Sequence, residues 1–164
     1  MRVDIRDEAT ADRAAVRSVV TQAFGRPAEA DLVERLRADG DVEIALVAFD
    51  RAGRIVGHVL FSPMTAPFRA LGLAPVAVLP ECQRSGIGGQ LIRAGIARAA
   101  AAGWAGIFVL GEPEYYQRFG FRPETAAGFT SQHAGSWLMA LALNGSLPAT
   151  TGQVDYAPAF ADLE

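Results

Sequence analysis

Residues 76–90 of the sequence read VAVLPECQRSGIGGQ, which combines an apolar strand, a glycine-rich turn and the start of a helix. The alanine-rich segment at about 87–102 continues with helical character. Backbone N–H groups in such a turn can point into one concavity, and the helix N-terminus adds partial positive charge. Gly86 and Gly88 lack a Cβ, so phosphate oxygens can approach the backbone closely. The stretch therefore predicts an anion-binding site.

Three phosphate-binding patterns compete for this turn. The Walker pattern needs a lysine, whereas all 15 basic residues of this chain are arginines. The dinucleotide pattern G-x-G-x-x-G needs a glycine where Leu91 stands. The third pattern, Gln/Arg-x-x-Gly-x-Gly/Ala, is matched in full by Gln83, Gly86 and Gly88. It is the coenzyme A pyrophosphate loop of the GNAT N-acetyltransferases, which this turn resembles. The alternative is a glycine-rich turn that only begins a helix.

The elements on either side of the turn predict a mixed α/β domain. Residues 106–110 are continuously apolar, as expected of a strand covered on both faces. Strand, helix and strand in succession imply a parallel crossover. Further strands are expected within residues 2–6, 42–49, 54–62, 65–78, 136–143 and 153–156. Helices are expected at about 10–24, 27–40 and 113–119.

Length and composition favour one compact domain spanning residues 1–164, with 51% apolar and 20% charged residues. A net charge of −3 gives no support to a nucleic-acid partner. The N-terminus has no apolar signal core, and the uncharged stretch at 99–111 is too short to cross a membrane. One cysteine and no Cys/His cluster predict neither a disulfide nor a metal site. We therefore expect a cytoplasmic protein without membrane, metal or nucleic-acid binding.

A second motif follows about thirty residues later. Residues 115–121 read YYQRFGF, which is similar to the Tyr-x-x-x-Gly-Phe segment on the helix after the fifth strand of the same family. The two motifs have the family's order and spacing. The chain also resembles the YhbS-like branch of the GNAT family from Ile5 to Phe160. Leu-Gly-Glu-Pro at 110–113 and the C-terminal Tyr-Ala-Pro-Ala-Phe at 156–160 carry that likeness.

The resemblance implies a mostly antiparallel central sheet, flanked by helices and splayed between its fourth and fifth strands. Acetyl-coenzyme A is the expected co-substrate in that opening. Its pantetheine is expected along the strand Val76, Ala77 and Val78. Its pyrophosphate is expected on the loop formed by Gln83, Arg84, Ser85, Gly86, Ile87, Gly88 and Gly89.

The resemblance also implies direct attack of an acceptor amine on the thioester. A protonated amine must first lose a proton, and the leaving thiolate benefits from a proton donor. Tyr116 stands where the family commonly has that donor; the alternative is a tyrosine packed on the core. Some relatives use a glutamate on the fourth strand as base, but residues 65–78 contain no carboxylate. Glu112 is the candidate base, with a solvated carboxylate near a helix N-terminus as its alternative.

The acceptor residues are predicted from the fold that the resemblance implies. Phe24 and Arg26 join the first two helices, which often form one wall of the acceptor pocket. His58 is either a base acting through water or a core histidine. The leading function is acetylation of a primary amine on a small molecule or a peptide N-terminus. The alternatives are an acyl-coenzyme A-binding regulatory module with little turnover and a transferase that uses a longer acyl donor. The family also includes many homodimers, so a homodimer stays open.

Overall fold

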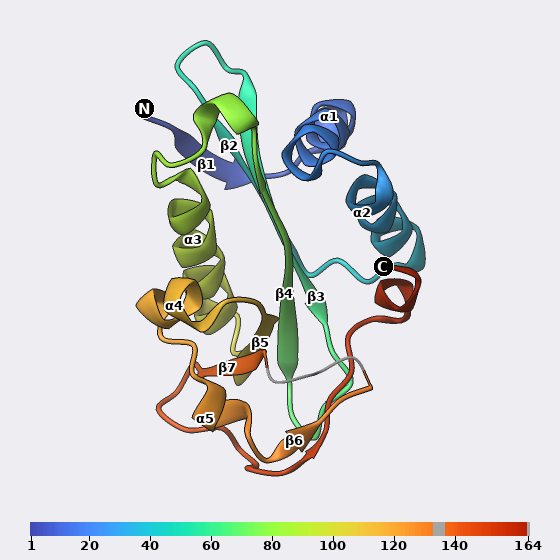
Figure 1. The fold of residues 1–164 in the computed structure, drawn as a ribbon, viewed down its shortest axis with the longest axis vertical. Coiled ribbons are helices and arrows are strands. Elements are labelled where there is room, and N and C mark those ends of the chain that lie inside the picture. The colour runs from blue at the N-terminus through green and yellow to red at the C-terminus, as the bar shows by residue number, and fades with distance from the viewer. Residues whose placement is uncertain (133–136, 164) are drawn as a thin grey trace.

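The computed structural model describes residues 1–132 and 137–163 (Figure 1). Within them, the central sheet has the strand order β1-β2-β3-β4-β5-β7, and its neighbours are antiparallel except for the parallel pair β4–β5. Its strands are β1 (Asp4–Asp7), β2 (Ile44–Phe49), β3 (Ile55–Pro63), β4 (Ala70–Val78), β5 (Gly106–Leu110) and β7 (Leu138–Ala142). A small second sheet pairs β6 (Phe129–Thr130) with β8 (Gly152–Gln153).

Helices cover both faces of the central sheet. The helices are α1 (Arg13–Phe24), α2 (Ala28–Asp39), α3 (Ile87–Ala101), α4 (Pro113–Tyr116) and α5 (Pro123–Ala126). Figure 1 shows α1 and α2 on one face and α3 on the other, with the C-terminal end of the chain beside α2. No helix among the described residues is long and apolar enough to cross a bilayer.

Two glycines let α3 lie close against β3. A Cβ on Gly57 of β3 would lie 3.0 Å from Leu91 Cδ1, and a Cβ on Gly95 of α3 would lie 2.0 Å from Phe61 Cε1. Every residue of β3 from Ile55 to Ser62 is buried, because helices cover the strand on both sides. The close contact fixes the position of α3, and with it the start of the helix, relative to the sheet.

The strands β4 and β5 separate part-way along their length. They pair only from Ala70–Gly106 to Gly72–Phe108, although β4 continues to Val78. Just beyond the last pair, Ala74 and the cis-linked Pro75 both lie opposite one residue of β3, which makes a β-bulge. This opening in the sheet matches the splay that the family resemblance implies.

Most predicted elements are present, with shifted ends. The strand expected within 65–78 begins at Ala70, and the one expected at 136–143 is β7; Ser136 lies outside the described residues. The last strand was predicted at 153–156, but β8 ends at Gln153 because Asp155 instead forms an isolated bridge with Thr65. The short elements α5 and β6 were not predicted.

Candidate active site

The glycine-rich loop leads from β4 into α3 and is held by its own side chains. Gln83 Nε2 donates a hydrogen bond to the Val78 carbonyl at 3.0 Å, and the Ser85 hydroxyl donates to the Cys82 carbonyl. Gly86, with φ of 83°, occupies the left-handed region, as does Arg84 with φ of 63°. Left-handed backbone is costly for a residue with a side chain, so Arg84 marks a constrained turn.

The first amides of α3 are available to a ligand. The first helical hydrogen bond of α3 runs from Gln90 N–H to the Gly86 carbonyl, at 3.1 Å. The amides of Ile87, Gly88 and Gly89 precede it, so the helix does not use them. They lie at the positive end of the helix dipole, which favours an anion.

The separated part of β4 presents a free edge. Leu79, directly after β4, donates its N–H to the carbonyl of Val56 in β3 at 2.9 Å, so these two residues form a hydrogen-bonded pair of the antiparallel ladder. Such pairs alternate along an antiparallel ladder, and Ala77 therefore also faces β3. The backbone groups of Val76 and Val78 consequently point the other way, toward the edge from which β5 has diverged, where the Val78 carbonyl also accepts the hydrogen bond from Gln83. An extended ligand can pair with this edge as another strand would.

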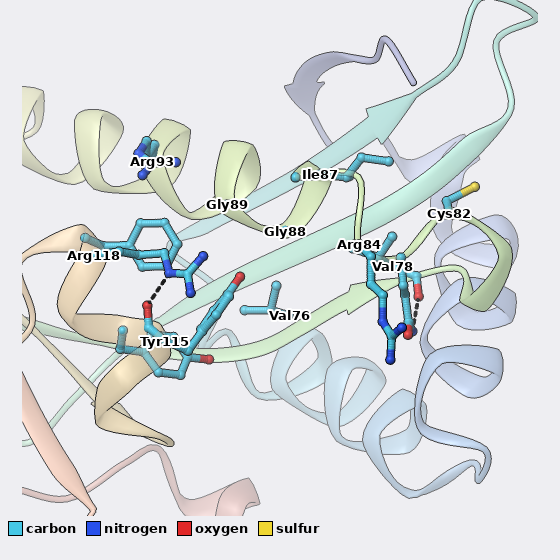
Figure 2. A pocket seen from close by; sticks show the side chains of 14 residues that line it. Val76, Val78, Cys82, Arg84, Ile87, Gly88, Gly89, Arg93, Tyr115 and Arg118 are labelled. Atoms are coloured by element: carbon cyan, nitrogen blue, oxygen red, sulfur yellow. Dashed lines mark hydrogen bonds between the residues drawn. The ribbon is translucent and has the colours of Figure 1, made fainter.

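The loop, the free edge and α4 enclose one cleft of about 610 Å³ (Figure 2). Three of its lining residues are arginines, and none of the described lining residues is acidic. The Arg93 guanidinium lies 4.8 Å from the Phe119 ring centroid, and that of Arg118 lies 4.7 Å from the Tyr115 ring centroid. The cleft is lined by Val76, Val78, Cys82, Gln83, Arg84, Gly86, Ile87, Gly88, Gly89, Arg93, Tyr115, Tyr116, Arg118 and Phe119. Its charge and free amides suit a phosphate-bearing ligand.

Tyr116 lies in this cleft beside the carboxyl end of β5. Its ring packs edge-on against Tyr115 and Phe121, with centroid distances of 5.0 and 6.0 Å. Burial, with a smaller effect of Tyr115, raises the pKa of Tyr116 to about 12. The hydroxyl therefore keeps its proton at neutral pH and can donate it or a hydrogen bond to a developing anion.

Comparison with known proteins identifies the family. The acetyltransferase (GNAT) domain model matches residues 41–123. The chain is 40% identical to the uncharacterized N-acetyltransferase YjhQ of Escherichia coli strain K12, over 78% of each chain. It is 37% identical to the uncharacterized N-acetyltransferase YhbS of the same strain, over 71% of this chain and 72% of YhbS. The chain belongs to the GNAT acetyltransferase family.

Two solved GNAT structures resemble the whole fold. One is the YhbS N-acetyltransferase from Escherichia coli in complex with CoA. It has a TM-score of 0.89 and 31% identity, and the match covers 100% of this chain and 94% of that one. The other is a GNAT acetyltransferase from Brucella melitensis in complex with acetyl-CoA, with a TM-score of 0.82 and 36% identity over 97% and 98% of the two chains. The predicted GNAT fold, a mostly antiparallel sheet flanked by helices, is confirmed.

The structure gathers most of the predicted cofactor residues of the GNAT motif. Two of them do not line the cleft. Ala77 is buried and faces β3 with its backbone, and Ser85 holds the loop through the Cys82 carbonyl. Of the two predicted catalytic residues, Tyr116 lines the cleft, whereas Glu112 is an exposed residue just before α4. The role of Glu112 as base stays a prediction.

His58 does not reach the cleft. It follows Gly57, whose missing side chain would face α3, so the His58 side chain lies on the opposite face of the sheet. It is fully buried, with Nε2 3.4 Å from Glu8 Oε1. Arg37 also pairs with Glu8. Burial acts to raise the pKa of Glu8, but His58 and Arg37 outweigh it and hold that pKa below its usual value.

The other two predicted acceptor residues also lie outside the cleft. Phe24 ends α1 and is exposed. Arg26 pairs with the buried Glu29 of α2, with 2.5 Å between Nη2 and Oε2. Their acceptor role stays a prediction.

Five cleft residues were assigned neither to the cofactor nor to catalysis from the sequence: Cys82, Arg93, Tyr115, Arg118 and Phe119. Helical spacing contains a signal for two of them. Arg93 follows Gly89 by four residues, and Arg118 follows Tyr115 by three, so each pair shares a helix face. Their meeting across the cleft depends on how α4 and the 3₁₀ turn that follows it (Gln117–Phe119) pack against α3, which spacing does not reveal.

Proposed function

We propose that this GNAT protein transfers the acetyl group of acetyl-coenzyme A to a primary amine, on a small molecule or a peptide N-terminus, in a ternary complex. The observation that carries the proposal is the continuous path from the amides of α3, along the free edge of β4, to the hydroxyl of Tyr116. The relatives crystallised with CoA and acetyl-CoA support the choice of donor.

The residues present fit this co-substrate. The pyrophosphate would accept hydrogen bonds from the amides of Ile87, Gly88 and Gly89, with Arg84 nearby as a counter-charge. The pantetheine amides would pair with the backbone of Val76 and Val78. The thioester would then lie at the opening of the sheet, near Tyr116.

The chemistry requires three proton movements. The ammonium group of the acceptor first loses a proton, and we propose that exposed Glu112 accepts it through water. The neutral nitrogen then attacks the thioester carbonyl carbon, forming the C–N bond while the C–S bond breaks, and Tyr116 donates its proton to the departing sulfur. The nitrogen loses its second proton to water as the amide forms, and Tyr116 is then reprotonated from solvent.

Calorimetric titration with acetyl-coenzyme A, coenzyme A and ATP tests the donor. Saturable binding of both coenzymes, without ATP binding, is expected. A folded protein that binds neither coenzyme would reduce the glycine-rich loop to a helix start and remove the enzymatic function.

The second candidate function is a regulatory module that binds acyl-coenzyme A with little turnover. It is favoured by one observation: none of the described residues lining the cleft is a carboxylate or a histidine that could act as a base. A regulatory module would bind acetyl-coenzyme A and release no coenzyme A with any amine. A series of acyl donors of increasing length separates an acetyltransferase from an enzyme for longer chains.

Glu112→Gln tests the proposed base. The variant is expected to have a lower kcat/KM for the amine and an unchanged affinity for the donor. An unchanged kcat/KM would exclude Glu112 as the base.

A further inference from the structure

A second cavity lies beside the opening of the sheet. Its volume is about 430 Å³, within the ~300–1,000 Å³ typical of small-molecule pockets. We call it the apolar pocket; it is lined by Leu73, Ala74, Leu110, Tyr156, Phe160 and Leu163. It shares none of its described lining residues with the cofactor cleft.

Tyr156, which lines the apolar pocket, lies on the face of the sheet opposite α3. Leu73 pairs with Phe61, which packs against Gly95 of α3, so Gly72 must face the opposite side of the sheet. A Cβ on Gly72 would lie 2.5 Å from Tyr156 Cε1. Tyr156 therefore packs directly on the sheet from the side opposite the cofactor cleft.

The pocket and the cleft border the same opening. Gly72 and Phe108 form the last pair between β4 and β5. Leu73, the next residue of β4, and Leu110, two residues further along β5, line the pocket, whereas Val76 further along β4 lines the cleft. A group bound in the pocket would therefore meet a donor bound in the cleft at the point where the strands separate.

Two tyrosines flank this opening from opposite faces. A Cβ on Gly111 would lie 2.4 Å from Tyr116 Cε2, which places Tyr116 over the end of β5 on the α3 side. On the other side, Tyr156 Oη donates a long hydrogen bond to the Phe108 carbonyl, at 3.4 Å. Burial, and to a smaller degree the nearby Tyr116, raises the pKa of Tyr156. Its hydroxyl is therefore neutral at physiological pH.

The lining of the pocket excludes charge. Among its six described lining residues, Tyr156 alone has a polar side-chain group. Asp162, which precedes the lining residue Leu163, is paired with Arg35 of α2. A second ammonium or a carboxylate in the pocket would lose its hydration without gaining a partner. An aryl or alkyl group would instead gain by leaving water.

We propose that the acceptor amine is carried by an aryl or alkyl group, and that this group binds in the apolar pocket. The substrate class rests on the acetyltransferase function proposed above. It gives a role to the C-terminal Tyr-Ala-Pro-Ala-Phe segment, because Tyr156 and Phe160, with rings 4.9 Å apart, form one wall of the pocket.

Matched pairs of amines test the class with the full chain and saturating acetyl-coenzyme A. Hexylamine is compared with hexamethylenediamine, which adds a second ammonium, and phenethylamine with ethanolamine, which replaces the ring by a hydroxyl. The apolar member of each pair is expected to have a kcat/KM higher by roughly tenfold or more. Equal or higher kcat/KM for the polar members would overturn the proposal.

A charge variant adds a test that does not depend on finding the natural acceptor. Leu110→Asp places a carboxylate in the pocket at a residue that is already 36% exposed. It is expected to reverse the preference toward hexamethylenediamine, because the second ammonium then has a partner. Ala52→Asp adds the same charge in the exposed turn between β2 and β3 and should keep the wild-type preference. A Leu110→Asp protein that still binds acetyl-coenzyme A with unaltered amine preference contradicts the proposal.

Calorimetric titration with acetyl-coenzyme A distinguishes failure of the acetyltransferase function from failure of the acceptor class alone. If the donor does not bind, the acetyltransferase function and the acceptor class fall together. If the donor binds and hexamethylenediamine or ethanolamine is the better acceptor, only the acceptor class is wrong. If the donor binds and none of the four amines releases coenzyme A, the acceptor class is wrong and the regulatory module is favoured over the transferase.

Discussion

Tyr116 occupies the space in which a side chain at position 111 would begin. A Cβ on Gly111 would lie 2.4 Å from Tyr116 Cε2 and 2.9 Å from its Cδ2. The glycine directly after β5 therefore lets the tyrosine ring lie over the end of the strand. The position of the proposed proton donor depends on the absence of a single methyl group.

Gly111→Ala is accordingly expected to displace the Tyr116 ring and lower kcat. The acetyl-coenzyme A Kd should stay close to that of the wild type, because the amides of α3 and the edge of β4 are untouched. Steady-state kinetics and calorimetry measure the two quantities. An unaltered kcat would show that the ring position is irrelevant to turnover.

Tyr116→Phe removes the proposed donor and preserves the packing of the ring. We expect kcat to fall by about 10²-fold or more, the usual range for a general acid, with donor affinity nearly unchanged. Because the pKa of Tyr116 is raised to about 12, the wild-type kcat should show no alkaline loss from this residue below about pH 10. A Tyr116→Phe enzyme with normal turnover would exclude it as the acid.

Gly88→Ala tests the anion site. The added Cβ would lie 3.3 Å from Tyr115 Oη, inside the cleft and next to the amides that the pyrophosphate needs. Weaker binding of acetyl-coenzyme A is expected, and a bulkier Gly88→Val should abolish it. The double variant Gly88→Ala/Tyr115→Phe removes the crowded hydroxyl. If the double variant regains affinity for acetyl-coenzyme A, the loss in Gly88→Ala comes from crowding of the Tyr115 hydroxyl. If its affinity stays low, the loss comes from blocking the ligand's approach to the backbone. Full affinity in Gly88→Val would refute the pyrophosphate assignment.

Glu8 predicts a pH dependence of stability. Its pKa is lower in the folded protein than in the unfolded chain, so the unfolded state binds more protons as the pH falls. The stabilisation is therefore present above the unfolded pKa and is lost as the pH drops through the folded pKa. Denaturant unfolding between neutral and acidic pH should show this loss. In Glu8→Gln the neutral-pH stability should be lower, since Arg37 loses its buried partner, and the acid dependence should be shallower. An acid dependence equal to that of the wild type would assign it to other carboxylates.

The sequence predicted the parts of the site that one continuous segment builds. The strand, glycine turn and helix around Gly86 form their anion site from local backbone, so a short motif contains the information. Tyr116 was also predicted, because it lies in a second local motif. Arg93 and Phe119 meet only through the packing of two helices. Tyr156 belongs to the C-terminal Tyr-Ala-Pro-Ala-Phe motif, but it reaches the opening of the sheet from the end of the chain, on a segment with little regular structure, so the motif did not reveal where its side chain lies. His58 shows the same limit, because strand alternation and the positions of Glu8 and Arg37 determine where its side chain lies.

The contact between Gly95 and Phe61 links the interior of the protein to its ligand affinity. An α-helix moves as a rigid element, and it rises by ~1.5 Å per residue. Gly95 therefore lies about 10 Å along α3 from the amides at the start of the helix. A side chain at position 95 would push this helix away from β3 and move its first amides relative to the edge of β4. The spacing between the two halves of the cofactor site is thus set by a hydrophobic contact that touches no ligand. Natural variation in this buried contact can tune donor affinity while every residue of the binding motif stays the same.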